Sequence, residues 1–383
     1  MTLHVLLWMP EHSRVPGGHN TQLEKTAAAL RNAGVAVRTA SEEAPSLKRI
    51  DVVHGFGLSP RHFRHARVAR LPVALSSVYW NLEYLAGLDD RGRPWASRYH
   101  RLRTAAVLAR AAWRGRHPEK CGDYSRAAAH FHTQFELADL LLPNSEGEAL
   151  AILEDLGVGT PMHVVPNAVD HTRFADDESI EHDDKPYVLM AGRFEPHKNQ
   201  LGLIRAMNGS GIPLKLIGPP HPDHPRYYDA CRRAAVGNVE LLPPVPHYEE
   251  LIPVYQRARV HALPSWYETT GLVSLEAALC GANVVTTDRG NTRDYFEGDA
   301  WFCDPARPAT IRRAVEDAFA AAPRHTLRRR IRSRYTWAHA AEATLEGYHK
   351  LLGRTPLSSQ PPSPPWRTDA SGEPTPGTLT LHA

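Results

Sequence analysis

Residues 260–285 constrain the fold more than any other part of the chain. An apolar run at 260–263 leads into a polar, glycine-containing turn at 267–271, and a helical pattern at 272–279 then precedes a second apolar run. A strand, a turn, a helix and a strand in this succession form the smallest unit of a parallel α/β sheet. The sequence therefore predicts a parallel-sheet α/β protein, with a ligand-facing turn between the first strand and the helix.

The turn of this unit has the residue types of a phosphate-binding site. Because it opens a helix, the backbone N–H groups of Thr270, Gly271 and Leu272 are expected to point beyond the strand ends, where they suit a phosphate. Gly271 also lets the backbone approach a ligand closely. Glu268 in the turn and Glu276 on the helix carry carboxylates, which accept hydrogen bonds from sugar hydroxyls. A lone glutamate is usually a surface residue, but two that flank a phosphate site indicate a sugar nucleotide.

Residues 268–281 also follow the pattern E-x-x-G-L-x-x-L-E-A-x-x-x-G. This pattern closely resembles the signature of family 4 retaining glycosyltransferases with the GT-B fold, the glycosyl transferases of group 1. The resemblance extends over residues 1–353. It implies two Rossmann-like parallel-sheet domains that face each other across a cleft, and a C-terminal helix that crosses back to the N-terminal domain. The C-terminal domain would hold a nucleotide-activated sugar, and the N-terminal domain would offer the acceptor.

A second motif lies upstream, at residues 192–199. Its sequence, Gly-Arg-Phe-Glu-Pro-His-Lys-Asn, resembles the G-R-x-x-x-x-K-N/G loop of the same family. A nucleoside diphosphate gains negative charge as the glycosidic bond breaks, so Arg193 and Lys198 are predicted to stabilise the leaving group. Surface positions for the two cations are the alternative. We expect no metal and no cofactor beyond the nucleotide-sugar co-substrate, linked to UDP or GDP.

The family resemblance implies a role for each of these residues. Arg193 and Lys198 would hold the diphosphate together with the N–H groups near Gly271, and Glu276 would bind the ribose hydroxyls. Glu268 would bind the donor sugar's hydroxyls and stabilise the developing positive charge. Transfer would retain the anomeric configuration by front-face attack, in which the leaving phosphate helps to take the acceptor proton.

The N-terminal half begins with an apolar run at 3–9, a Gly17-Gly18 pair and a helical pattern at 22–33. The glycine spacing is not GxGxxG, which counts against an NAD or FAD site. The pair resembles the family's N-terminal glycine loop, so Gly17 and Gly18 are predicted to face the donor diphosphate; a plain flexible loop is the alternative. Further strands of this half are predicted at 35–39, 51–56, 71–76, 137–143 and 163–166.

The residues after the strand at 71–76 depart from the family pattern. Many relatives carry Thr-x-His there, with the histidine near the reacting centre, whereas residues 76–80 read Ser-Ser-Val-Tyr-Trp. Trp80 and His132 are predicted on the acceptor side. His130 is another candidate substitute, although a spacing of two residues on a helix sends His130 and His132 to different faces.

Residues 98–116 are rich in arginine, interleaved with alanine, leucine and Trp113. This pattern favours a solvated helix at the acceptor-side rim. A basic amphipathic helix on an anionic membrane is the alternative, and would give a peripheral membrane contact. The acceptor is accordingly left open among a glycan, a lipid-linked molecule and a small molecule.

Helix signals and composition divide the chain. Ser145, followed by Glu148 three residues later, predicts a capping box at the start of a helix. The predicted divisions are an N-terminal acceptor domain, a polar linker, a donor domain, a crossing helix and a disordered tail rich in proline and serine. Their residue ranges are 1–172, 173–186, 187–335, 336–353 and 354–383.

Charge and cysteine content exclude several classes of protein. The 45 Lys and Arg residues nearly balance the 42 Asp and Glu residues, so a nucleic-acid partner is not expected. The four cysteines form no C-x-x-C pair, and His221 and His224 lie in a proline-rich turn without a third ligand, so no metal site is predicted. The first residues are those of a strand rather than a signal peptide, and no apolar run is long enough to span a membrane. A cytoplasmic protein is expected, with a peripheral location at the inner membrane face as the alternative.

Several other functions compete with glycosyl transfer. An epimerase or a phosphorylase would use the same fold and nucleotide sugar or a related substrate. A non-catalytic sugar-nucleotide-binding protein would explain the missing Thr-x-His histidine, but both glutamates and both cations argue against it. A nicotinamide-dependent dehydrogenase is the weakest alternative, because the dinucleotide fingerprint is absent.

Overall fold

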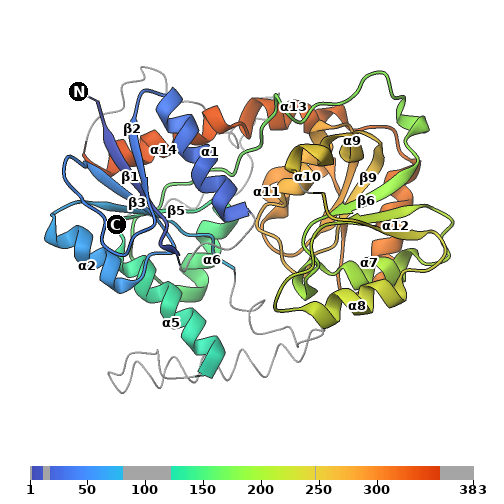
Figure 1. Ribbon diagram of the computed structural model, residues 1–383, viewed down its shortest axis with the longest axis horizontal. Helices are drawn as coiled ribbons and strands as arrows, with labels where there is room; N and C mark the ends of the chain where they lie inside the picture. The colour runs from blue at the N-terminus through green and yellow to red at the C-terminus, as the bar shows by residue number, and fades with distance from the viewer. Residues whose placement is uncertain (1, 12–17, 81–121, 246, 354–383) are drawn as a thin grey trace, which may run out of the picture.

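The structure, a computed structural model, describes residues 2–11, 18–80, 122–245 and 247–353. Two parallel sheets lie side by side, one from the N-terminal half and one from the C-terminal half (Figure 1). Each sheet has a hydrophobic core on both faces, where helices pack against it. The predicted pair of parallel-sheet α/β domains is therefore confirmed. The residues predicted at Gly17, 98–116 and 354–383 lie outside the described part of the chain.

The N-terminal sheet has the strand order β2-β1-β3-β4-β5, and all its pairs are parallel. Successive side chains of β1 enter opposite cores: Leu6 and Trp8 face one side, and Val5 and Leu7 the other. The strands are β1 His4–Trp8, β2 Ala36–Ala40, β3 Val52–Phe56, β4 Val73–Ser76 and β5 Leu140–Leu142. The helices are α1 Gly18–Asn32, α2 Pro60–Val68, α5 Gly122–Leu137 and α6 Glu146–Leu156.

The C-terminal sheet has the order β11-β10-β9-β6-β7-β8, again all parallel. Its strands are β6 Tyr187–Ala191, β7 Leu214–Ile217, β8 Val239–Leu242, β9 Ala258–Leu263, β10 Asn283–Thr287 and β11 Trp301–Cys303. Its helices are α7 Gln200–Met207, α8 Pro225–Ala234, α9 Leu251–Gln256, α10 Leu272–Leu279, α11 Thr292–Phe296, α12 Pro308–Ala320 and α13 His325–Arg334. The helix predicted at 272–279 has these bounds in the structure.

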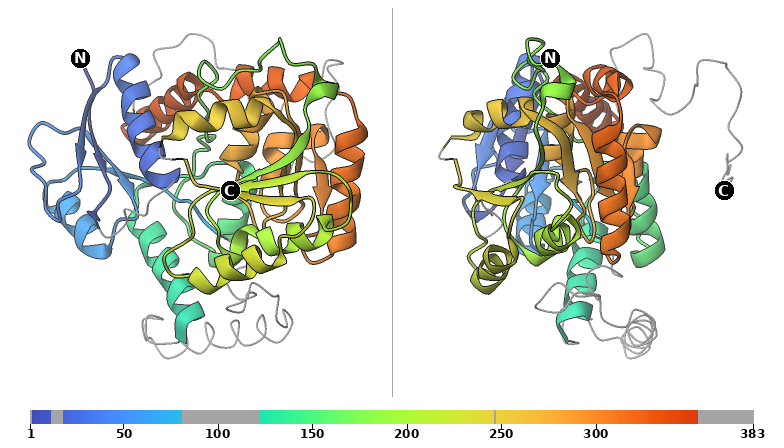
Figure 2. Two further views of the ribbon diagram at one scale, coloured as in Figure 1. Left: turned by 45° about the vertical axis from the view of Figure 1, so that its right-hand side comes forward. Right: turned by 90° about the vertical axis from the view of Figure 1, so that its right-hand side faces the viewer.

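The last helix, α14 (Trp337–Leu351), returns to the N-terminal sheet, as the family resemblance implies. It lies beside α1, away from the C-terminal sheet that precedes it in the chain (Figures 1 and 2). Ala341 and Tyr348 of α14 are buried in the core between α1 and the N-terminal sheet. The Tyr348 hydroxyl lies 2.7 Å from Nδ1 of His54, a fully buried histidine on β3. The two ends of the chain therefore contribute to one N-terminal unit.

The strand predicted at 163–166 is wrong. The chain forms an isolated bridge between Leu141 and Met162, with additional hydrogen bonds from the N–H groups of His163 and Val165 to β5 and the residue that follows it. Pro161 and Pro166 flank this segment, and because proline lacks an N–H donor, a regular ladder does not extend there. The strand predicted from residue 137 begins only at Leu140, because α5 continues to Leu137.

The segment expected to be a polar linker is anchored to the C-terminal half by ion pairs. Lys185 is 2% exposed, and its Nζ atom lies 2.8 Å from Oδ1 of Asp176. Arg328 of α13 contacts the other carboxylate oxygen of Asp176 at 2.8 Å. A buried ion pair with a second cation holds this part of the segment against the C-terminal half. Within the described residues, no helix is both long enough and apolar enough to cross a membrane.

Candidate active site

The predicted donor residues lie at the point where the order of the C-terminal sheet reverses. Strands β6 and β9 are neighbours there, although the chain builds outward from them in opposite directions. Ligands of open α/β sheets bind beyond the carboxyl ends of such a pair of strands. Arg193 and Lys198 follow β6, and Glu268 follows β9, so the fold brings the two sequence motifs together at this edge.

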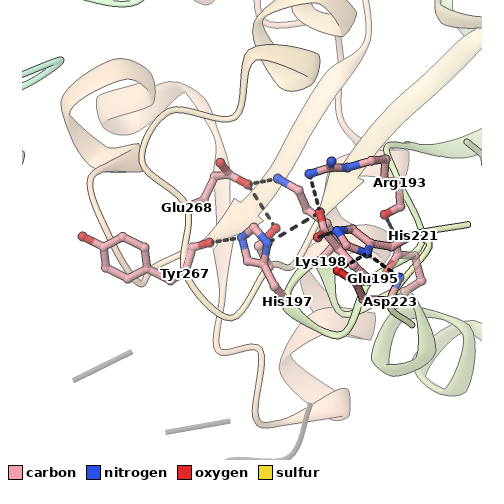
Figure 3. A network of polar contacts seen from close by, with 10 residues as sticks. Arg193, Glu195, His197, Lys198, His221, Asp223, Tyr267 and Glu268 are labelled. Carbon is pink, nitrogen blue, oxygen red and sulfur yellow. Dashed lines mark hydrogen bonds and ion pairs between the residues drawn. The ribbon is translucent and has the colours of Figure 1, made fainter. Parts of the chain in front are cut away.

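Lys198 and Glu268 form an ion pair in the site (Figure 3). Lys198 Nζ donates to Glu268 Oε2 at 2.7 Å, and the Ser265 hydroxyl donates to the same oxygen at 3.2 Å. Burial acts to raise the pKa of Glu268, but the charges of Lys198 and His197 and these hydrogen bonds outweigh it and lower that pKa below its ordinary value. Glu268 is therefore an ionised acceptor, as a ligand for sugar hydroxyls must be.

Arg193 belongs to a second charged group around Glu195, which was not predicted as a site residue (Figure 3). Arg193 Nη2 lies 3.4 Å from Glu195 Oε1, and His197 Nδ1 lies 3.8 Å from the same oxygen. Burial opposes ionisation of Glu195, but the hydrogen bond and charge of His197, with the charges of Arg193 and Lys198, lower its pKa to about 2. The only sequence signal for Glu195 is its position between the cations of the 192–199 motif.

The start of α10 carries the three backbone N–H groups that were predicted to bind a phosphate. Within the described residues, the N–H groups of Thr270, Gly271 and Leu272 donate no hydrogen bond. Gly271 adopts φ +78°, a left-handed conformation that favours glycine. Gly290 also has a positive φ, and a Cβ atom there would lie 2.3 Å from the carbonyl oxygen of Glu268. That close backbone approach positions the Glu268 turn.

Glu276, predicted to bind ribose, is buried and hydrogen-bonded to two phenols. The hydroxyl of Tyr248 lies 2.5 Å from its carboxylate, and that of Tyr255 lies 3.2 Å away. Desolvation by burial raises the pKa of Glu276 to about 7, although both phenols act against the shift. The Tyr248 residue is 44% exposed, whereas Tyr255 is fully buried. Tyr248 and Glu276 are 28 residues apart in the sequence, so the sequence alone does not predict their contact.

The N-terminal half contributes Trp80 to this region. The Trp80 ring packs on His197 of the C-terminal half, with ring centroids 4.8 Å apart and an interplanar angle of 42°. His132 lies half-buried on α5, whereas His130 is exposed, so the two point to different faces as expected. Gly18 is the first residue of α1, which begins earlier than the helix predicted at 22–33.

The capping box predicted at the start of α6 is only half correct. The Ser145 hydroxyl accepts from the N–H of Glu148 at 3.1 Å, as predicted. The Glu148 carboxylate does not return to Ser145. It is fully buried and accepts hydrogen bonds from the Ser77 hydroxyl and from the N–H groups of Tyr79 and Asn144. Tertiary contacts therefore take this side chain away from its local partner.

A cavity of about 650 Å³ lies elsewhere, between α1 and α14. Lys25, Asp170, Trp337 and Glu342 are among the residues that line it. The predicted donor residues are not part of this lining in the described chain. The chemistry at the β6–β9 edge, rather than cavity size, therefore defines the candidate active site.

The chain resembles known glycosyltransferases in both sequence and structure. Residues 172–334 match the family model described as Glycosyl transferases group 1. The D-inositol 3-phosphate glycosyltransferase of Rhodococcus erythropolis is 27% identical over 87% of this chain and 86% of its own length. The sucrose-phosphate synthase of Thermosynechococcus elongatus has a TM-score of 0.68 at 17% identity, over 92% of this chain and 99% of that protein. Anabaena Alr3699/HepE, solved with UDP and glucose, has a TM-score of 0.62 at 14% identity, over 90% of this chain and 98% of that protein.

These likenesses agree with the geometry of the site. The fold is GT-B, with two parallel-sheet α/β domains, and the chain is a glycosyltransferase. Its residues 172–334 are similar to the glycosyl transferases of group 1, the family whose signature the motif at 268–281 resembles.

Proposed function

We propose that this glycosyltransferase takes a sugar from a nucleotide-activated donor and transfers it, with retention of the anomeric configuration, to a hydroxyl group of the acceptor. The single observation that carries the proposal is the β6–β9 edge. There the Lys198–Glu268 ion pair, Arg193 and the N–H groups at the start of α10 follow two neighbouring strands, at the same edge of the sheet. This set of groups suits a diphosphate with a hydroxylated group on either side.

The charges at this edge suit the leaving group. As the bond between the sugar's anomeric carbon and the phosphate oxygen breaks, the electron pair moves to the diphosphate. Lys198, Arg193 and the N–H groups of 270–272 stabilise that charge in a partly desolvated site. The fixed positive groups support a reaction without a metal ion or any other cofactor.

The carboxylates have separate roles in the proposed mechanism. Glu268 accepts from hydroxyls of the transferred sugar and stabilises the positive charge that develops on its anomeric carbon. Glu276 accepts from the ribose hydroxyls, and the Tyr248 hydroxyl gives up its hydrogen bond to make room. The acceptor oxygen then bonds to the anomeric carbon on the face that the phosphate leaves, and its proton passes to the leaving phosphate oxygen.

A donor screen tests this function. UDP-, GDP-, ADP- and dTDP-sugars would each be assayed for thermal stabilisation and slow hydrolysis, with and without EDTA. UDP-glucose comes first, because the structurally similar Anabaena protein was solved with UDP and glucose. We expect stabilisation by one base, with hydrolysis that EDTA leaves unchanged and an NMR-detected product of the donor's anomeric configuration. Inversion, or loss of turnover in EDTA, would contradict the mechanism.

The runner-up is a sugar-nucleotide-binding protein without transferase activity. It is favoured only by the absence of the family's Thr-x-His histidine at 76–80. Binding of a nucleotide sugar with no hydrolysis, and no transfer to glycan, sugar-phosphate or lipid-linked acceptors, would support it. A peripheral membrane contact through residues 98–116 is a separate proposal, which co-sedimentation with anionic vesicles would test.

A further inference from the structure

The turn after β4, residues 77–80, has a backbone conformation that its sequence does not favour. Val78 has φ +41°, although valine is β-branched and strongly disfavours positive φ. A single residue in the left-handed region costs on the order of 1–3 kcal/mol. Such strain persists only where surrounding contacts hold it, and it is concentrated at functional sites. The turn therefore raises the question of what holds it and what it positions.

Glu148 holds the turn. One carboxylate oxygen, Oε1, accepts from the Ser77 hydroxyl at 2.6 Å and from the Tyr79 N–H at 2.6 Å, which closes a bridge over Val78. The other oxygen accepts from the Asn144 N–H at 2.7 Å. Burial raises the pKa of Glu148, and the three hydrogen bonds oppose that shift without overcoming it. A buried carboxylate without a cationic partner is costly, so this arrangement has a specific geometric use.

Tyr79 is the inward anchor of the same turn. Its ring is fully buried against Phe131 and Phe135, and its hydroxyl donates to Asp155 at 2.8 Å. With Tyr79 fixed in the N-terminal core, the next residue points out of that core. That residue is Trp80, whose ring crosses to His197 of the C-terminal half.

His197 connects Trp80 to the reacting centre. Its Nε2 atom lies 2.9 Å from the carbonyl oxygen of Tyr267, and its own carbonyl accepts from the Trp266 N–H at 2.9 Å. The next residues along each chain segment are Lys198 and Glu268, the ion pair of the site. Trp80 therefore packs on the loop that carries the group predicted to bind the transferred sugar.

We infer that Trp80 is the wall of the donor-sugar subsite contributed by the N-terminal half, and that Glu148 is its positioning residue. This inference rests on the proposed function. The C–H face of a sugar ring packs on an aromatic ring, while hydroxyls at its edge reach polar groups such as Glu268. In this chain an aromatic wall occupies the region where relatives carry a histidine. Trp80 recognises the sugar by shape and apolar contact, and contributes nothing to nucleotide binding.

Calorimetry with UDP and with UDP-glucose tests the inference, or the corresponding pair if the donor screen selects another base. In the wild type, Trp80→Phe and Trp80→Ala, UDP should bind with the same affinity within about twofold. Trp80→Ala should lose about tenfold in UDP-glucose affinity, close to 1.4 kcal/mol, whereas Trp80→Phe keeps the aromatic face and most of the affinity. Equal UDP-glucose affinities for wild type and Trp80→Ala would overturn the inference. Failure of the wild type to bind any nucleotide or nucleotide sugar would instead contradict the proposed function.

Glu148→Gln tests the positioning role, with Glu154→Gln as the matched control on the exposed face of the same helix. The amide has one acceptor oxygen, so it cannot serve all three donors. Glu148→Gln should weaken UDP-glucose binding about threefold and shift the His197 ring resonances, which Trp80 shields. Glu154→Gln should change neither. His197 resonances that shift in Trp80→Ala but stay unchanged in Glu148→Gln would overturn the positioning role. Because Trp80 is half-buried rather than in a core, its variants keep the test open if Glu148→Gln does not fold.

Discussion

The two halves of the molecule each bury a carboxylate near the contact between Trp80 and His197, but in opposite electrostatic environments. Glu268 in the C-terminal half contacts a lysine, and its pKa is lowered. Among the described residues, Glu148 in the N-terminal half accepts from neutral donors alone, and its pKa is raised. Under the proposed function, the charged environment of the C-terminal half suits an ionic ligand. The N-terminal half uses a carboxylate as a structural clamp that sets the position of an aromatic ring.

Removal of the positively charged Lys198 side chain should have the largest effect on activity. Lys198→Ala should lower kcat by about 10²–10³, the scale for losing one group that stabilises developing charge. Stability should fall as well, because Glu268 is left buried without its partner. Steady-state kinetics with the donor from the screen measures this, and Lys48→Ala, at an exposed position of the N-terminal half, is the control. An unchanged kcat would contradict the assignment of Lys198 to the diphosphate.

Loss of the ribose acceptor should affect binding more than chemistry. Glu276→Ala should raise the donor KM by about tenfold or more, on the scale of hydrogen bonds to a charged group, and leave kcat closer to the wild-type value. The kcat of this variant should therefore exceed that of Lys198→Ala. Donor affinity equal to that of the wild type would exclude the ribose role.

The pKa of Glu276 predicts a pH dependence of binding. Its folded-state pKa of about 7 lies above the ordinary value of 4.5. The carboxylate, which accepts two ribose hydroxyls better than the neutral acid, therefore forms between pH 6 and 8. UDP-glucose affinity should rise severalfold over this range. UDP-glucose is the proper probe because it lacks the terminal phosphate that titrates near pH 6 in UDP. A flat profile in the wild type, or a retained slope in Glu276→Gln, would contradict this prediction.

The titration of Glu276 also predicts how the stability of the protein changes with pH. Because the folded-state pKa is raised, the folded state binds more protons than the unfolded state between about pH 4.5 and 7. The free energy of unfolding should therefore fall as pH rises through this window, by up to about 3 kcal/mol from this group alone. Denaturant unfolding of wild type and Glu276→Gln at pH 5 and 8 measures the difference. Glu268, whose pKa is lowered, should contribute the opposite slope, at lower pH.

The smallest expected effects are changes in stability at two residues with a left-handed backbone conformation, one in each half. Asn199 adopts φ +60°, and its Nδ2 atom donates to the carbonyl oxygens of Pro264 and Pro305, both at 3.1 Å. Asn199→Gly should destabilise by about 1–3 kcal/mol, because those buried carbonyls lose their donor. Val78→Gly should change stability by less than about 1 kcal/mol, because relief of the strained φ offsets the added chain entropy. A larger loss in Val78→Gly would show that Val78 itself, rather than Glu148, holds the turn.

Most of the C-terminal half could be predicted from sequence because its signals are local. The bounds of α10 follow from a helical pattern between Gly271 and Gly281, and the spacing of Glu268 and Glu276 is set by one turn and one helix. The strand predicted at 163–166 failed for a local reason that pattern alone underweights, the two flanking prolines. The N-terminal half was harder, because its key contact joins residues far apart in sequence.

The sequence by itself determined the fold class, the two motifs that hold the predicted site residues, and the residues that carry charge in those motifs. Periodicity, glycine positions and motif spacing are properties of consecutive residues, so they can be read along the chain. Only the tertiary structure decided the partners: Lys198 with Glu268, Glu276 with Tyr248, and Trp80 with His197. Glu148 shows the reason. Its carboxylate could accept a hydrogen bond at the start of its own helix, but buried N–H and hydroxyl donors, most of them in a distant turn, need the same acceptor. Leaving those buried donors without a hydrogen bond would cost more free energy than leaving the capping bond unmade.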